Sequence, residues 1–99
     1  MALSVDMLHL SKNSLVADAL EISMYNGAWG SMHPSGRWFT YDTPMDGCRV
    51  PFFADYNWQT RPGSPEFNCC SATGAKMVGQ LCEWATIKEA DGLTVNYFG

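Results

Sequence analysis

The stretch that decides the fold prediction is Asn68-Cys-Cys-Ser-Ala-Thr-Gly-Ala-Lys-Met-Val-Gly-Gln-Leu-Cys-Glu-Trp84. Its apolar residues recur at helical spacing and predict a helix from Ser71 to about Lys88. The apolar face of this helix is formed by Met77, Val78, Leu81, Cys82, Trp84 and Ala85. Cys82 lies on that face beside Val78, so we expect it to pack in the core. Cys69 and Cys70 fall at or just before the N-terminus of the helix.

The chain on either side of this stretch is also predicted to be largely helical. Apolar spacing predicts a helix over residues 2–10 and a second one from 15 to about 26, with Gly27 as its C-terminal cap. A turn at 33–36 precedes a short aromatic strand at 37–41, and residues 42–66 are long and irregular. Residues 88–91 are expected to be a solvated helix end, followed by a turn at 91–92 and a strand over 93–98.

The composition excludes several classes of protein. The 99 residues are 16% charged and 13% aromatic, which is unlike a disordered segment. The net charge of −4 argues against a nucleic-acid partner, and no apolar run is long enough for a membrane span. So few charges beside so many aromatics suggest a surface covered by further chain. We therefore expect an internal fragment that lacks an N-terminal portion.

The adjacent cysteines carry the most chemistry. A disulfide between neighbours is disfavoured, because their Cα atoms are only ~3.8 Å apart. Amide groups at a helix N-terminus favour thiolates, which are both zinc ligands and nucleophiles. The alternative is that both are small buried hydrophobes. Their spacing matches no standard zinc motif, and the use of Cys48 is left undetermined.

Several segments together resemble glycoside hydrolase family 127, the β-L-arabinofuranosidase-like proteins. Arg61-Pro-Gly-Ser-Pro-Glu-Phe-Asn-Cys-Cys-Ser71 and Asp91-Gly-Leu-Thr-Val-Asn-Tyr-Phe98 carry the more specific part of the likeness. Ala17-Asp-Ala-Leu-Glu21, Tyr25-Asn-Gly27 and Gly36-Arg-Trp-Phe-Thr-Tyr41 are similar to upstream segments of the family. The segments occur in the family's order along nearly the whole chain.

The resemblance implies a mainly α fold, part of an (α/α)6 barrel over 1–90, with a β-sandwich starting at 91–99. It implies retaining hydrolysis of L-arabinofuranosides or similar sugars, with Cys69 as nucleophile and zinc ligand and Cys70 as a second zinc ligand. Glu21 and Tyr41 fall where the family places residues near the sugar. A Glu and a Cys that complete the zinc site, and the general acid/base Glu, are expected before Met1. We therefore expect the 99 residues alone to be inactive.

Some assignments stay open at this stage. Trp29, Trp38 and Trp58 suit a sugar site, with core packing as the alternative. Glu21 is either a buried functional carboxylate or a solvated one, and His33 is expected to be an exposed loop residue rather than a ligand. For the whole chain, the rival functions are a non-catalytic zinc- or carbohydrate-binding protein of the same fold and an inactive gene fragment.

Overall fold

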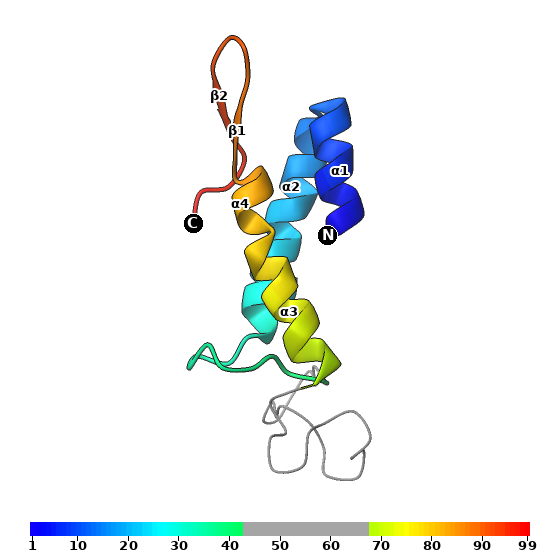
Figure 1. Ribbon diagram of the computed structural model, residues 1–99, viewed down its shortest axis with the longest axis vertical. Coiled ribbons are helices and arrows are strands. Elements are labelled where there is room, and N and C mark those ends of the chain that lie inside the picture. The colour runs from blue at the N-terminus through cyan, green and yellow to red at the C-terminus, as the bar shows by residue number, and fades with distance from the viewer. Residues whose placement is uncertain (43–67) are drawn as a thin grey trace.

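The computed structural model describes residues 1–42 and 68–99, which form a mainly helical chain with one small sheet (Figure 1). Helices α1 (Ala2–Ser11) and α2 (Ser14–Ser23) are followed by the π-helix η1 (Met24–Trp29). Helices α3 (Cys69–Gly79) and α4 (Leu81–Trp84) lead into strands β1 (Thr86–Lys88) and β2 (Leu93–Val95). The mainly α prediction is therefore confirmed for the described residues, and Cys48, Trp58 and most of the 42–66 loop lie outside them.

The break between α1 and α2 is set by two local features. Lys12 adopts a left-handed conformation (φ 55°), and its amide donates to Leu8 O to close α1. Asn13 then caps α2, because its side-chain oxygen accepts from the Leu15 amide at 2.9 Å. Helix α1 ends one residue later than predicted, and α2 begins one residue earlier than predicted.

The predicted cap at Gly27 is wrong. The helix continues past Ser23 as η1, and Gly27 lies inside this π-helix. Among the described glycines only Gly36 has a positive φ, of 72°. A π-helix bonds i to i+5 rather than i to i+4, and apolar spacing gives no sign of that change.

The predicted helix end at 86–88 is also wrong, because these residues form β1. Thr86 pairs with Val95, Ile87 with Thr94 and Lys88 with Leu93 in an antiparallel hairpin. The turn at 91–92 is confirmed, but β2 is shorter than the predicted strand over 93–98. The aromatic strand at 37–41 reduces to a single bridge between Met32 and Phe39. Pairing across the following turn, which helical spacing does not indicate, makes residues 86–88 a strand.

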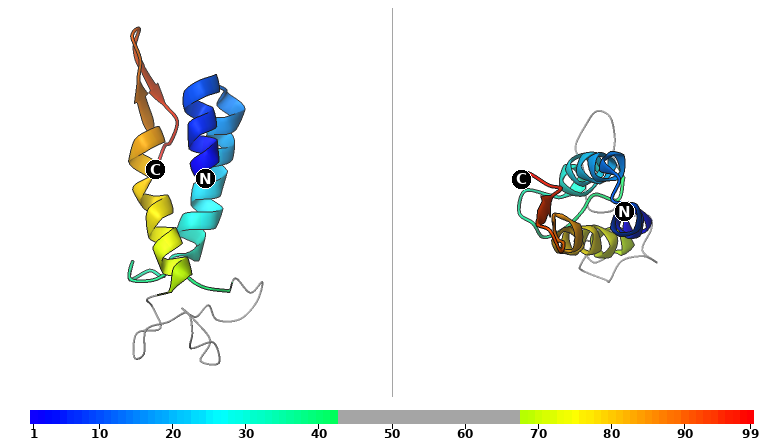
Figure 2. Two further views of the ribbon diagram at one scale, coloured as in Figure 1. Left: turned by 45° about the vertical axis from the view of Figure 1, so that its right-hand side comes forward. Right: turned by 90° about the horizontal axis from the view of Figure 1, so that it is seen from above.

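The helices pack around one apolar core (Figure 2). Trp84, Leu20 and Met24 are its largest fully buried side chains. Cys82, predicted to be in the core, is exposed instead. Two helical residues two positions apart lie about 200° around the axis from each other, so the burial of Trp84 turns Cys82 outward. The full core consists of Val5, Leu8, Ala17, Leu20, Met24, Ala28 and Trp84.

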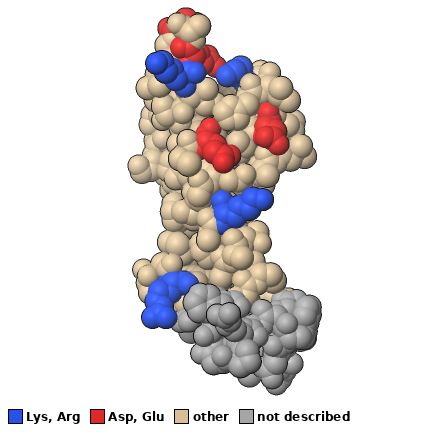
Figure 3. All heavy atoms as spheres, in the orientation of Figure 1, with Lys and Arg blue, Asp and Glu red and all other residues tan. Residues whose placement is uncertain are grey.

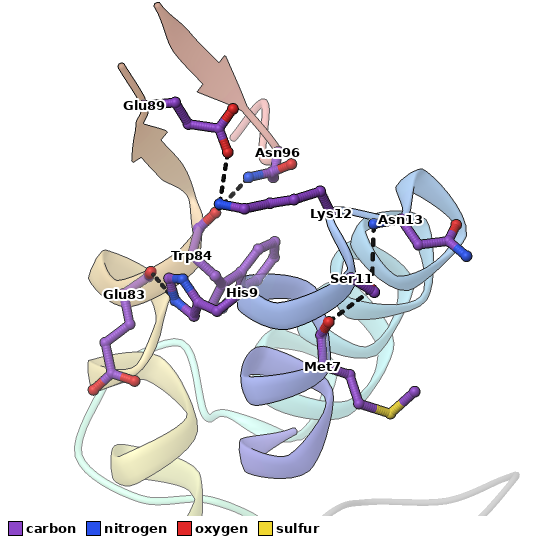
Figure 4. A network of polar contacts seen from close by, with 9 residues as sticks. All are labelled: Met7, His9, Ser11, Lys12, Asn13, Glu83, Trp84, Glu89 and Asn96. Carbon is purple, nitrogen blue, oxygen red and sulfur yellow. Dashed lines mark hydrogen bonds and ion pairs between the residues drawn. The ribbon is translucent and has the colours of Figure 1, made fainter. Parts of the chain in front are cut away.

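Polar contacts join α1, α4 and the hairpin (Figure 4). His9 contacts the Glu83 carbonyl at 3.0 Å, and Lys12 forms an ion pair with Glu89 at 2.6 Å. The Asn96 side chain donates to the Trp84 carbonyl at 2.9 Å. These contacts fix the position of β1 and β2, although a two-stranded hairpin alone is marginally stable.

Large apolar side chains remain exposed on the outer faces of the described elements. Leu3 and Leu10 on α1 are 73% and 86% exposed, and Phe98 is 78% exposed. Charged side chains are sparse on the face drawn in Figure 3. No helix among the described residues is long and apolar enough to cross a membrane.

Candidate active site

The two adjacent cysteines open α3. Asn68 precedes them as the N-cap, and its side-chain oxygen accepts from the Ser71 amide at 3.0 Å. Asn68 is buried, Cys69 is exposed and Cys70 is half-buried. The two Sγ atoms lie 4.0 Å apart. The cap therefore presents both thiols together from one turn.

The pKa of the Cys70 thiol moves opposite to the expectation for a helix N-terminus. Burial raises this pKa above the ordinary value, and the adjacent Cys69 thiol and the Asp42 carboxylate raise it further. Each of these effects disfavours a negative charge on the sulfur, and together they outweigh the amides of the first turn. In the chain alone, Cys70 is therefore held more firmly as a neutral thiol than an ordinary cysteine.

The segment that carries Tyr41 lies beside the double cysteine. The Phe39 amide donates to Ser71 Oγ at 3.3 Å, and the Phe39 ring packs over Gly74 on the next turn of α3. Asp42 is close enough to influence the Cys70 thiol. The structure thus brings the half-buried Tyr41 to the same end of α3 as the cysteines, while its role as a sugar ligand stays a prediction.

Glu21 is held by a different part of the chain. It lies on α2, half-buried, and its Oε1 accepts from the Phe98 amide at 3.3 Å. It also lines a cavity of about 390 Å³ between the start of α2 and the hairpin, with Asp18, Ile87 and Thr94 among the other lining residues. The contacts recorded for Glu21 are with the C-terminal segment, and its predicted role near a sugar stays a prediction.

The tryptophans proposed for a sugar site occupy two different environments. Trp29 is half-buried and donates from Nε1 to Tyr97 Oη at 2.9 Å. Trp38 is half-buried and stacks on His33, with ring centroids 4.4 Å apart. His33 lies in a loop as predicted, but it is half-buried rather than exposed. The stacked His33–Trp38 pair was not predicted, and no spacing in the sequence indicates it.

Comparison with protein-family models places the chain. Residues 1–83 match the model described as beta-L-arabinofuranosidase, GH127 catalytic domain. The chain belongs to this family. Searches of curated proteins and of solved structures returned no significant match. The resemblance drawn from the sequence is thereby confirmed, and a glycoside hydrolase class follows for the GH127 domain that the chain represents.

The described residues supply part of a zinc site at most. Among residues 1–42 and 68–99, no group of three or more His, Cys, Asp or Glu side chains could hold a metal ion. Two sulfurs on one tetrahedral zinc, each bonded at ~2.3 Å, lie about 3.8 Å apart. The observed Sγ separation of 4.0 Å fits that arrangement. Cys69 and Cys70 therefore suit two of four positions around such a metal.

Proposed function

We propose that this GH127 chain carries the nucleophile and half of the zinc ligands of a retaining glycosidase acting on L-arabinofuranosides or similar sugars. The observation that carries the proposal is the pair of Sγ atoms 4.0 Å apart in the first turn of α3, in a chain that matches the GH127 catalytic domain. Cys69 is the nucleophile because it is the more exposed of the two thiols. Both cysteines are zinc ligands.

The reaction then follows the double displacement of retaining glycosidases. Cys69 Sγ attacks the anomeric carbon, and a C–S bond forms as the glycosidic C–O bond breaks. An acid/base Glu elsewhere in the domain gives its proton to the departing oxygen and later takes one from the water that releases the sugar. Bound zinc would keep the sulfurs deprotonated and make sulfur the better leaving group in the second step.

Tyr41 and Glu21 contact the sugar, and the rest of the chain forms the surrounding fold. Tyr41 lies at the cysteine end of α3 and binds a substrate hydroxyl, while Glu21 contributes a carboxylate acceptor. The helices form part of an (α/α)6 barrel, and 91–99 starts a β-sandwich. Strand β1 (86–88) pairs with β2 (93–95), so the hairpin spans the proposed boundary between residues 90 and 91.

The metal assignment is tested by replacing single cysteines in a protein that carries the whole catalytic domain. Cys70→Ser should lower the zinc content, because a neutral hydroxyl is a poor substitute for a thiolate. Cys82→Ser is the matched control, since this exposed thiol lies on α4 away from the pair. Metal analysis that finds full zinc occupancy in Cys70→Ser would show the ligand assignment to be wrong.

A further inference from the structure

One column of side chains on α2 and η1 holds the segment that follows β2. Glu21 Oε1 accepts from the Phe98 amide at 3.3 Å, and Tyr25 Oη donates to the Phe98 carbonyl at 3.1 Å. Trp29 Nε1 donates to Tyr97 Oη at 2.9 Å. We call Glu21, Tyr25 and Trp29 the tail column. Its three members each hold a different atom of residues 97–98.

The π-helix explains why these three residues share one face. They are spaced four apart, and in an α-helix each such step drifts about 40° around the axis. The wider turn of η1, which needs more than four residues, reverses that drift between Tyr25 and Trp29. The Tyr25 ring also stacks on Tyr97, with centroids 5.3 Å apart. π-Helices are rare overall, but those that occur are often found at functional sites. In this chain the π-helix aligns the tail column.

The neighbouring face of η1 is part of the core. Met24 and Ala28 are both 0% exposed and belong to the cluster that includes Trp84. Helix η1 also packs directly against α3, the helix that carries the double cysteine. If the contacts with residues 97–98 are lost and η1 moves, α3 is displaced as well, because a close-packed core transmits displacement.

A continuous set of contacts leads from the end of η1 to the cysteines. The amide of Met32 donates to the Trp29 carbonyl at 3.2 Å, and the Thr40 amide donates to the Ser31 carbonyl at 2.9 Å. The Phe39 amide then bonds Ser71 Oγ, one residue beyond Cys70. Hydrogen bonds and short stretches of backbone thus connect the tail column to the first turn of α3.

We propose that Tyr25 and Trp29 are positioning residues for the double-cysteine site: by holding residues 97–98 they fix η1, and through it the 31–42 segment that lies against Cys70. The inference rests on the proposed function, because it takes Cys69 and Cys70 as the reacting groups. It assigns a role to the C-terminal segment, which the family match over residues 1–83 does not reach.

The test is the rate at which iodoacetamide alkylates each cysteine of the full chain after chelation of metal. Tryptic peptide 77–88 carries Cys82, and peptide 50–76 carries both Cys69 and Cys70. Fragmentation of peptide 50–76 in the mass spectrometer then assigns the label to Cys69 or Cys70. Trp29→Phe keeps an aromatic ring but removes the donor to Tyr97, and Tyr97→Phe removes the other partner. Loss of the Trp29–Tyr97 hydrogen bond should raise the rate of Cys70 alkylation about five-fold.

Two controls accompany this measurement: the double variant Trp29→Phe with Tyr97→Phe, and the alkylation rate of Cys82 as an internal reference. If the two substitutions act through one contact, the double variant should raise the Cys70 rate no further than either single variant. Cys82 should react at an unchanged rate, since Tyr97→Phe keeps the ring that packs on Trp84 of α4 and the exposed Cys82 thiol has its own bond to the Gly79 carbonyl. Tyr25→Phe, which leaves the stack on Tyr97 in place, should give a smaller rise at Cys70.

Two results would overturn the proposal. One is an unchanged Cys70 rate in both single variants. The other is an equal rise at Cys70 and Cys82, which would mean general loosening of the fold. Because alkylation needs no turnover, neither result depends on whether the domain hydrolyses a glycoside. Failure of hydrolysis with the expected alkylation pattern would count against the proposed function alone.

Discussion

The two ends of the α3–α4 helix pair hold their neighbours by different means. At the α3 end, the contacts of the 31–42 segment include the Phe39 ring packed over Gly74 and the Phe39–Ser71 hydrogen bond. At the α4 end, the hairpin is held by several polar contacts, including the Lys12–Glu89 ion pair and the Asn96–Trp84 hydrogen bond. The proposed chemistry lies at the end where an aromatic ring packs directly on a helix glycine.

This difference predicts how sensitive each end is to substitution. A ring packed directly on a glycine depends on close complementarity, so a single added atom has a large effect. A hairpin held by several exposed polar contacts loses little when one of them is removed. The expected effects of the following substitutions therefore fall from the cysteine end to the hairpin end.

The largest effect is expected at Cys69. In a protein that carries the whole catalytic domain, Cys69→Ala should lower glycoside hydrolysis at least about a thousand-fold, because the nucleophile is lost. Cys82→Ala should leave hydrolysis unchanged. A haloacetamide-type sugar mimic followed by mass spectrometry should modify Cys69. A label on Cys82 with Cys69 untouched would contradict the assignment.

Gly74 and Gly79 give a matched pair on one helix. A Cβ at Gly74 would overlap the Phe39 ring, so Gly74→Ala should lower the free energy of unfolding by about 1–3 kcal/mol despite better helix propensity. Gly79 has open space, and Gly79→Ala should raise that free energy by about 0.5–1 kcal/mol. Chemical denaturation measures both. A gain at both positions would mean that the Phe39 contact is not restrictive.

The same contrast explains which features could be predicted from the sequence. Features set by neighbouring residues were predicted correctly: the break between the helices at 2–10 and from 15, and the turn at 91–92. The helix that carries the double cysteine was also identified, with its start two residues early in the structure. The family was identified from motif order, and the match over residues 1–83 confirms it.

Features that depend on pairing or packing partners outside the helical pattern could not be predicted. Residues 86–88 become a strand because they pair with 93–95, and the exposure of Cys82 follows from which face Trp84 buries. The continuation of α2 into η1 depends on a hydrogen-bond pattern that apolar spacing does not encode. The contact of Glu21 with Phe98 joins residues 77 positions apart, and neither residue alone indicates it.

A smaller effect is expected at the helix caps. Asn68→Ala removes the acceptor for the Ser71 amide and should lower the free energy of unfolding by about 1–2 kcal/mol. Asn13→Ala removes the equivalent bond to Leu15 at an exposed position and should cost about 0.5–1 kcal/mol. The buried cap costs more because water cannot replace the lost partner. Equal losses in denaturation experiments would show that burial at Asn68 adds nothing.

The smallest effect is expected at the Lys12–Glu89 ion pair of the hairpin end. Its side chains are 50% and 32% exposed, so water and salt compete with the 2.6 Å contact. Glu89→Gln should lower the free energy of unfolding by less than about 1 kcal/mol at low ionic strength. The difference should vanish near 1 M salt, where charges are screened beyond about 3 Å. Asp91→Asn is the control, since Asp91 forms no ion pair within the described part of the chain. A loss above about 2 kcal/mol that persists in salt would show that one contact, rather than several small ones, holds the hairpin.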